Sequence, residues 1–184
     1  MTIFSVAFFS CSAPSSIIED RTCNGFHHLC ERDPTQVLFA GTHNSMSSAE
    51  EEWIAPNHQY AIPQQLKDGI RALNIDTYWW EDEAYMCHGF CEIGAQPLSW
   101  ATDEIADFLE REPNNVLIIT FQSTLTAEET LLPFLSSGLE HELYTHQVDQ
   151  DWPSIGTLID NKQRLLVFSN HDGGSEGYMD QWKH

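Results

Sequence analysis

The chain has 184 residues, of which 41% are hydrophobic, and 28 acidic side chains against 8 lysines and arginines give a formal net charge of −20. This length suits one domain and this hydrophobic content suffices for a core, while no apolar run reaches the roughly 18–20 residues of a membrane-spanning helix. Because phosphate backbones and anionic membranes attract clustered basic residues, the charge argues against nucleic acid as a partner and leaves at most a peripheral membrane contact.

The first 13 residues predict a possible signal peptide. An apolar stretch at 3–9 precedes small residues at 10–13, as in front of a signal-peptidase site. Cleavage after residue 13 would remove Cys11 and leave four cysteines: Cys23, Cys30, Cys87 and Cys91. An even number of cysteines suits two disulfides, which form outside the cytoplasm. We therefore expect a secreted or extracytoplasmic protein with a disulfide-bearing segment at 14–36.

From residue 37 onward, apolar runs alternate with amphipathic stretches. Four runs predict buried strands: 37–40, 71–76, 116–121 and 164–168. The stretches between them predict helices: 63–68, 98–112, one opening at Thr126, and 153–160. Strands that alternate with helices are typical of an α/β domain with a parallel sheet, which we assign to residues 37–184.

The helix opening at Thr126 carries the most specific local signals. Thr126 and Glu129 fit a capping box, and Pro133 predicts a kink or a restart within the helix. Four leucines are expected on its inner side: Leu131, Leu132, Leu135 and Leu139.

Polar side chains follow each predicted strand directly. They are His43 and Asn44, Asp76, Gln122 and Ser123, and the segment 170–172. Barrels build their sites from the loops after the C-terminal strand ends, whereas an open doubly wound sheet gathers polar groups at one switch point. The pattern therefore favours a barrel, and no glycine-rich nucleotide-binding loop follows any strand.

Two histidines lie after predicted strands, at positions suited to a catalytic role. His43 follows the first predicted strand, and His88 follows the second strand and its aromatic loop. Two imidazoles on one barrel face suit paired general-base and general-acid work near neutral pH. The other histidines considered lack such a context and are interpreted as surface or core residues: His27, His28, His58, His141 and His146.

The cysteines admit two interpretations. Histidines lie between the cysteines of each pair, so a zinc site is conceivable. The spacings are not those of a CxxC motif and export favours oxidation, so we expect disulfides instead. Four cysteines allow three pairings, and Cys23–Cys30 with Cys87–Cys91 closes the shortest loops.

Several motifs together resemble one family. They are THNS at 42–45, QLKDGIRALNIDTY at 65–78, CHGFC at 87–91 and FLEREPNNVLIITFQS at 108–123. Taken in this order they resemble the phosphatidylinositol-specific phospholipase C X-domain family, also called PLC-like phosphodiesterases. CNG at 23–25 and LC at 29–30 add a likeness to its exported, cysteine-containing members. The resemblance covers roughly residues 23–170.

The resemblance implies a TIM-type (β/α) barrel and a phosphoric diester hydrolase that cleaves a glycerophospholipid of the phosphatidylinositol type. His43 matches the family's general base, which deprotonates a headgroup hydroxyl for attack on the adjacent phosphorus. His88 matches the acid that protonates the departing lipid-side oxygen.

The resemblance also implies a calcium site. Asn44 and Asp76 match calcium-binding positions of the metal-dependent branch, whereas the metal-independent bacterial branch has arginine at the position of Asp76. Two further positions, typically Glu in metal-dependent members, are Asn74 and Gln122 here. Neutral amides donate oxygen but lower the affinity for a hard cation, so Ca²⁺ is expected to bind weakly.

The length does not suit a complete barrel. Eight βα units usually take about 250 residues, and the pattern accounts for four or five. We therefore expect an incomplete barrel, either a fragment of a longer product or a truncated relative. Two alternatives stay open, a glycerophosphodiesterase-like barrel enzyme and a non-catalytic barrel relative that only binds.

Overall fold

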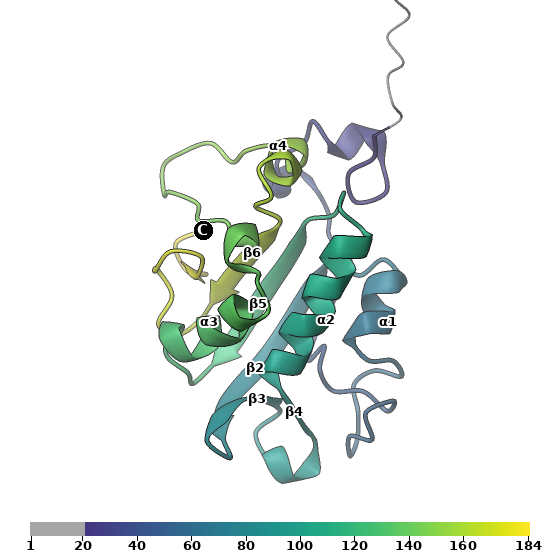
Figure 1. Cartoon of the computed structure of the whole chain (residues 1–184), viewed down its shortest axis with the longest axis vertical. Coiled ribbons are helices and arrows are strands. Elements are labelled where there is room, and N and C mark those ends of the chain that lie inside the picture. Colours follow the sequence, from purple (N-terminus) through teal and green to yellow (C-terminus); the bar gives the residue numbers. More distant parts are fainter. Residues whose placement is uncertain (1–20) are drawn as a thin grey trace, which may run out of the picture.

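The computed structural model describes residues 21–184, and the possible signal peptide at 1–13 lies outside them. One face of a twisted sheet carries three helices, and a fourth helix packs beside the N-terminal segment at one end of the sheet (Figure 1). The helices are α1 (Ile62–Lys67), α2 (Leu98–Arg111), α3 (Ala127–Ser136) and α4 (Ile155–Asp160). None of the helices in this part of the chain has the length and hydropathy needed to cross a membrane.

The sheet orders its strands β4-β3-β2-β5-β6-β7, and β1 pairs with β2 beside β3. The strands are β1 (Gly41–Thr42), β2 (Ala72–Trp80), β3 (Glu83–Cys87), β4 (Ala95–Pro97), β5 (Leu117–Ser123), β6 (Leu165–Ser169) and β7 (Met179–Asp180). The strands β1, β2, β5, β6 and β7 are parallel, and the β2-β3-β4 meander is antiparallel. Short 3-10 helices lie in the connections: His27–Leu29, Pro34–Gln36, Cys91–Ile93 and Glu140–Glu142.

The main core lies between the sheet and helices α1 to α3. Leu73 and Ile75 of β2 are buried in it, as is Phe121 of β5, against which Phe134 of α3 packs edge-on. Successive side chains of a strand point to opposite faces. The residues of β2 that alternate with Leu73 and Ile75 therefore face away from the helices, which is where Asn74 and Asp76 lie.

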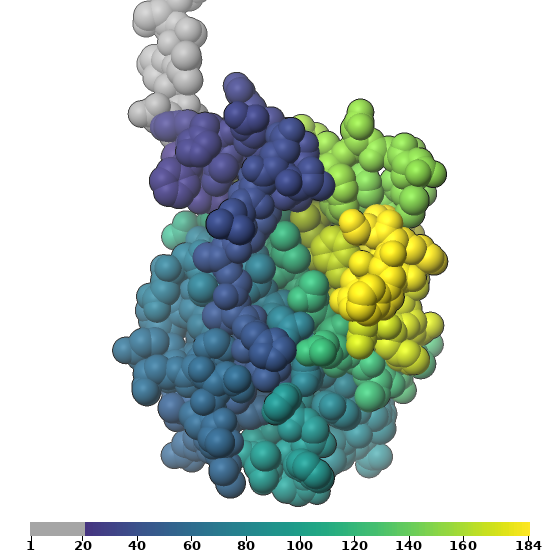
Figure 2. All heavy atoms as spheres, turned by 180° about the vertical axis from the view of Figure 1, so that it is seen from behind, coloured from purple at the N-terminus to yellow at the C-terminus, as the bar shows by residue number. Residues whose placement is uncertain are grey.

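The N-terminal segment covers the other face of the sheet, where it runs as the dark blue strip in the view from behind (Figure 2). Its Val37 and Phe39 pack against a second, smaller core that includes Leu166 and Met179. This packing shields the helix-free side of β5 and β6 and leads the chain into β1.

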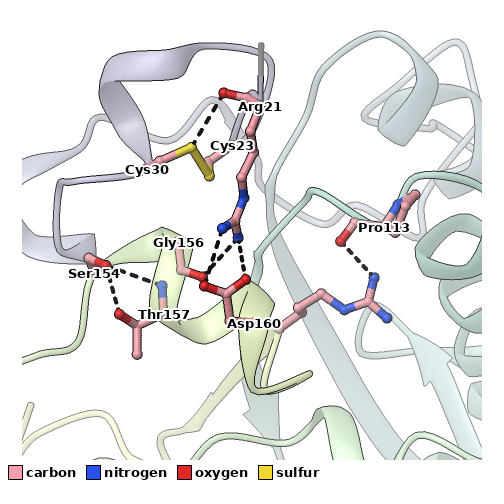
Figure 3. A network of polar contacts seen from close by, with 9 residues as sticks. Arg21, Cys23, Cys30, Pro113, Ser154, Gly156, Thr157 and Asp160 are labelled. Carbon is pink, nitrogen blue, oxygen red and sulfur yellow. Dashed lines mark hydrogen bonds and ion pairs between the residues drawn. A yellow bond between two sulfur atoms is a disulfide. The ribbon is translucent and has the colours of Figure 1, made fainter. Parts of the chain in front are cut away.

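The end of the sheet near α4 is held by polar and covalent links (Figure 3). Arg21 forms an ion pair with Asp160 at 2.9 Å and donates a hydrogen bond to the carbonyl of Gly156 at 3.0 Å. The N–H of Gly156 in turn donates to the carbonyl of Cys30. A disulfide joins Cys23 to Cys30, the predicted pairing. Because α4 leads into β6, these links secure the N-terminal ends of the strands and leave the opposite end free for a site.

The strand predicted at 37–40 is wrong. This segment is not part of the sheet, and Leu38 is 98% exposed. Val37 and Phe39 pack on the second core, which explains the apolar pattern. The backbone of the segment first forms hydrogen bonds to the sheet at Ala40, whose carbonyl accepts from the N–H groups of Arg71 and Ala72. Only Gly41–Thr42 therefore forms the strand.

The predicted strand 71–76 ends too early, and the aromatic loop after it is part of the strand. β2 continues to Trp80 and turns into β3 through Glu81 and Asp82, which have φ values of 49° and 67°. A two-residue loop with both φ values positive is a type I′ hairpin turn, usually signalled by Asn-Gly or Asp-Gly. Neither dipeptide is present here, so the sequence pattern does not predict the hairpin. It does not predict β4 or β7 either.

Helix α3 has its predicted beginning but not its predicted inner face. The capping box between Thr126 and Glu129 is confirmed, and Pro133 lies inside a continuous helix. Leu132 and Leu135 are exposed, while Thr130 and Phe134 are buried in their place. The packing of Phe134 on the sheet sets the rotation of the helix, and this turns those two leucines outward.

Candidate active site

The candidate catalytic side chains meet beside β2, where the parallel strand β1 and the antiparallel strand β3 both end. His43 follows β1, Asp76 lies within β2, and His88 follows β3. The Nε2 atom of His88 lies 3.9 Å from Oδ2 of Asp76. Both histidines are exposed and Asp76 is buried, so a buried carboxylate stands behind two accessible imidazoles.

Burial raises the pKa of the Asp76 carboxyl, while the charges of His88 and His43 act in the opposite direction. Both imidazoles are therefore close enough to Asp76 to influence its charge. A carboxylate with two nearby histidines in a polar strand-end site is the kind of constellation in which proton transfer is performed.

The turn that carries His43 is fixed to β2 by hydrogen bonds. The N–H of Ser45 donates to the carbonyl of Asn74 at 2.8 Å, and the hydroxyl of Ser45 accepts from the N–H of Asn74 at 3.0 Å. Asn44 is buried and adopts the left-handed backbone conformation with φ 53°, which asparagine tolerates better than most residues. The turn thus places His43 and Asn44 beside β2.

Gln65 of α1 holds the same turn from the helix side. Its amide nitrogen donates to the carbonyls of Ser45 and Tyr60, and its oxygen accepts from the hydroxyl of Thr42, all at 2.8 Å. No residue-type or spacing signal singles out Gln65. Its only signal was its place in the QLKDGIRALNIDTY motif, because a glutamine on a short helix is usually a surface residue.

Three buried oxygens at this end of the sheet have no hydrogen-bond partner: Asn44 Oδ1, Asn74 Oδ1 and Asp76 Oδ1. The amide nitrogen of Asn44 donates to Asn57 at 3.4 Å, and that of Asn74 donates to the carbonyl of Thr120 at 3.3 Å. Both amides are thereby oriented with their oxygens free. Buried unpartnered oxygens are uncommon and costly, and amide and carboxylate oxygens are what a hard cation prefers.

The donor set therefore fits a calcium ion through one carboxylate and two amides. Gln122 of β5 is paired in register with Asp76 of β2, and its side chain is exposed. Among residues 21–184 no group of three His, Cys, Asp or Glu side chains could hold a metal, so an ion here would depend on neutral amide oxygens beside the single carboxylate of Asp76. The zinc interpretation of the cysteines is not supported, because all four are in disulfides.

The loop that presents His88 is closed covalently. A disulfide joins Cys87, the last residue of β3, to Cys91, with Cα atoms 5.0 Å apart, as predicted. Cys87 is also paired with Ala95 of β4. The loop is thus tied to the sheet at both of its ends, and His88 is the first residue beyond the strand.

Exposed apolar side chains lie on the loops that follow His43 and His88 in the chain. Ile54, Phe90 and Ile93, which we call the apolar rim, are exposed, and the N–H of Ile54 donates to the carbonyl of Ile93 at 2.9 Å. The rim thus joins the 45–60 loop to the disulfide-closed loop that carries His88. A contiguous exposed apolar patch is typical of an interaction surface.

Comparison with known proteins adds a family and a fold. A family model described as PI-PLC X matches residues 29–179. An uncharacterized secreted protein of Arthroderma benhamiae is 30% identical over 159 residues, which are 83% of this chain and 36% of that protein. A PI-PLC X domain-containing protein of Arabidopsis thaliana is 25% identical over 185 residues, 94% of this chain and 42% of that protein. The chain thus spans less than half the length of these relatives.

Solved structures show the same fold. The phosphatidylinositol-specific phospholipase C of Listeria monocytogenes matches with a TM-score of 0.57 at 20% identity, over 78% of this chain and 54% of that one. The Staphylococcus aureus enzyme, solved in work on modulating its membrane binding, matches with a TM-score of 0.58 at 19% identity, over 79% and 51%. The described residues therefore form part of a TIM-type barrel of the PI-PLC kind, as expected.

Proposed function

Since the chain belongs to the PI-PLC X domain family, we propose that it takes part in phosphoric diester hydrolysis of a glycerophospholipid of the phosphatidylinositol type. The observation that carries the proposal is the meeting of His43, Asp76 and His88 at one end of the sheet, with 3.9 Å between Asp76 Oδ2 and His88 Nε2.

The proposed chemistry is a pair of proton transfers. His43 removes the proton of a headgroup hydroxyl, whose oxygen attacks the neighbouring phosphorus and forms a cyclic phosphodiester. His88 gives a proton to the lipid-side oxygen as its bond to phosphorus breaks. The negative charge of Asp76 faces the imidazole that must carry the proton. One histidine has to begin neutral and the other protonated, so the rate follows a bell-shaped pH profile.

We further propose calcium as a weakly bound cofactor. Asn44, Asn74 and Asp76 would hold it, with Gln122 as a further oxygen donor, and the three unpartnered buried oxygens support this assignment. A bound calcium ion would stabilise negative charge on the phosphoryl oxygens. With one charged ligand the affinity is expected to lie in the range of extracellular calcium sites. The disulfides, and a relative named as secreted, support a place outside the cell.

The apolar rim supports a lipid surface as the place of action. Phe90 lies two residues after His88 in the disulfide-closed loop, and a backbone hydrogen bond joins Ile93 at the end of that segment to Ile54. A formal charge of −20 opposes anionic surfaces, so we propose peripheral contact with a mainly zwitterionic lipid surface.

Turnover of phosphatidylinositol by the full-length product, across a calcium titration, tests the proposal. His43→Ala and His88→Ala should each lower kcat by roughly 10²–10⁴-fold, while Asp76→Asn should raise the calcium concentration needed for half-maximal rate. His141→Ala is the matched control, because His141 is an exposed histidine of the Glu140–Glu142 helix. Unchanged turnover in His43→Ala would overturn the mechanism. Calcium-independent turnover would remove the metal, and hydrolysis of glycerophosphodiesters alone would favour the alternative enzyme class.

A further inference from the structure

We infer that Asn57 and His58 are positioning residues, which together clamp His43 and Asn44 of the proposed site. Two consecutive residues of the loop before α1 contact two consecutive residues of the turn after β1. The inference rests on the proposed function of that turn. It gives a role to His58, which the sequence pattern left as a surface or core residue, and to Asn57, which no sequence signal distinguishes.

The two contacts are of different kinds. His58 Nε2 lies 2.7 Å from the main-chain carbonyl oxygen of His43. Because a carbonyl oxygen only accepts, Nε2 carries the hydrogen and His58 is the donor. The side-chain oxygen of Asn57 accepts from the amide nitrogen of Asn44 at 3.4 Å. The first contact holds the backbone of the proposed base, and the second holds the side chain of a proposed metal ligand.

The clamp is itself anchored. The N–H groups of Asn57 and His58 both donate to the carbonyl of Ser47, at 3.1 and 3.0 Å, and the carbonyl of His58 accepts from Ala49 at 2.9 Å. These bonds close the 47–58 loop at its base, and Ser48 and His58 form an isolated bridge there. The two clamp side chains therefore project from a fixed point beside the turn.

The contact with Asn57 determines which end of the Asn44 amide stays free. Asn44 Oδ1 is buried without a partner, whereas its nitrogen is held by Asn57. Without an acceptor at Asn57, the amide could rotate and present its nitrogen in place of its oxygen. A cation requires the oxygen, so Asn57 would act on a bound calcium ion through Asn44.

The contact with His58 complements that of Gln65. Gln65 holds Thr42 and Ser45 from α1, on either side of His43 and Asn44 in the sequence. His58 holds the carbonyl of His43 itself. Small displacements of a reacting group can cost large factors in rate, which is what the clamp prevents.

The experiment uses paired removing and conserving variants of the full-length protein. His58→Phe keeps a ring and removes the donor, whereas His58→Gln keeps an amide N–H. Asn57→Ala removes the acceptor, whereas Asn57→Asp keeps one. His141→Phe and Asn161→Ala make the corresponding changes at exposed positions on the Glu140–Glu142 helix and at the end of α4.

The first measurement is hydrogen exchange of two amides: that of Ser45, which donates to the carbonyl of Asn74, and that of Ser47, which donates to the carbonyl of Asn44. The others are kcat and KM on phosphatidylinositol, and the calcium dissociation constant by calorimetry. His58→Phe should speed this exchange and lower kcat by roughly tenfold each, the size expected for one lost hydrogen bond, with KM unchanged. Asn57→Ala should weaken calcium binding several-fold. The conserving variants should restore wild-type values.

Unchanged exchange of Ser45 and Ser47 in both removing variants would overturn the clamp. So would wild-type kcat and calcium affinity despite faster exchange, or faster exchange throughout α2, since the latter indicates a general loss of stability. A wild-type protein without turnover, but with exchange that responds as expected, would defeat the proposed function and support the clamp.

Discussion

Truncating Phe90 tests whether the apolar rim contacts lipid. The ring is 72% exposed and lies two residues after His88, in the disulfide-closed loop. Complete burial of such a side chain contributes about 1.5–3 kcal/mol, so transfer of its exposed part into a lipid surface contributes about 1–2 kcal/mol. Phe90→Ala should therefore weaken partitioning onto vesicles by a factor of roughly 5–30.

The assay is sedimentation of the protein with phosphatidylcholine vesicles, followed by turnover on vesicles and on a water-soluble phosphodiester. Phe90→Ala should lower binding and vesicle turnover together and leave turnover of the soluble substrate unchanged. Leu132→Ala is the control, because Leu132 is 60% exposed on α3, away from the site. Equal losses in both variants, or none in Phe90→Ala, would refute a specific lipid contact at the rim.

Three further results are expected. Because burial raises the pKa of Asp76 in the folded chain, its stabilising contribution is present below the unfolded pKa and is lost as pH rises through the folded pKa. Calcium-free Asp76→Asn should therefore unfold at a higher temperature than wild type at pH 7, with the difference vanishing near pH 4 in thermal scans. Replacing Cys87 and Cys91 by alanine should cost about 2 kcal/mol in denaturant unfolding and lower kcat more than it changes KM, because the loop of His88 loses its closure. Phe134→Ala should cost about 3–5 kcal/mol in the same assay, without changing the pH profile.

The parts of the fold that could be predicted depend on local chemistry. The capping box of Thr126 and Glu129 needs only residues three apart, and the apolar face of α2 repeats within one helix. The hairpin after Trp80 could not be predicted, because its turn adopts two positive φ values at Glu81 and Asp82. Aspartate is among the residues that adopt positive φ, but glutamate is not, so this dipeptide does not indicate the turn. Pairing between β2 and β3 selected it.

Some residues of the candidate site could be predicted from the sequence and others could not. The proximity of His43 and Asp76 could be anticipated, because parallel strands bring their C-terminal ends to one edge. That of His88 depends on the β2-β3 hairpin, which runs antiparallel and brings the end of β3 back beside Asp76. The roles of Gln65 and His58 could not be anticipated, since both depend on how the loop between β1 and α1 folds back onto the turn. A hydrogen bond from a histidine to a main-chain carbonyl cannot be predicted from sequence spacing, because every residue has such a carbonyl.

The unpartnered oxygens connect stability to function. A buried acceptor left without a partner costs on the order of 1–3 kcal/mol, and three of them lie around β2. Leu73 and Ile75 bury apolar surface on the opposite face of the same strand. This packing can offset the cost of the unpartnered oxygens even when no ligand is bound. Calcium bound only by the folded chain would return part of the loss, about 2.7 kcal/mol at a hundred times its dissociation constant. The order of stability of wild type and Asp76→Asn should therefore reverse when calcium is added. An unchanged order at saturating calcium would contradict the assignment of Asp76 as a calcium ligand.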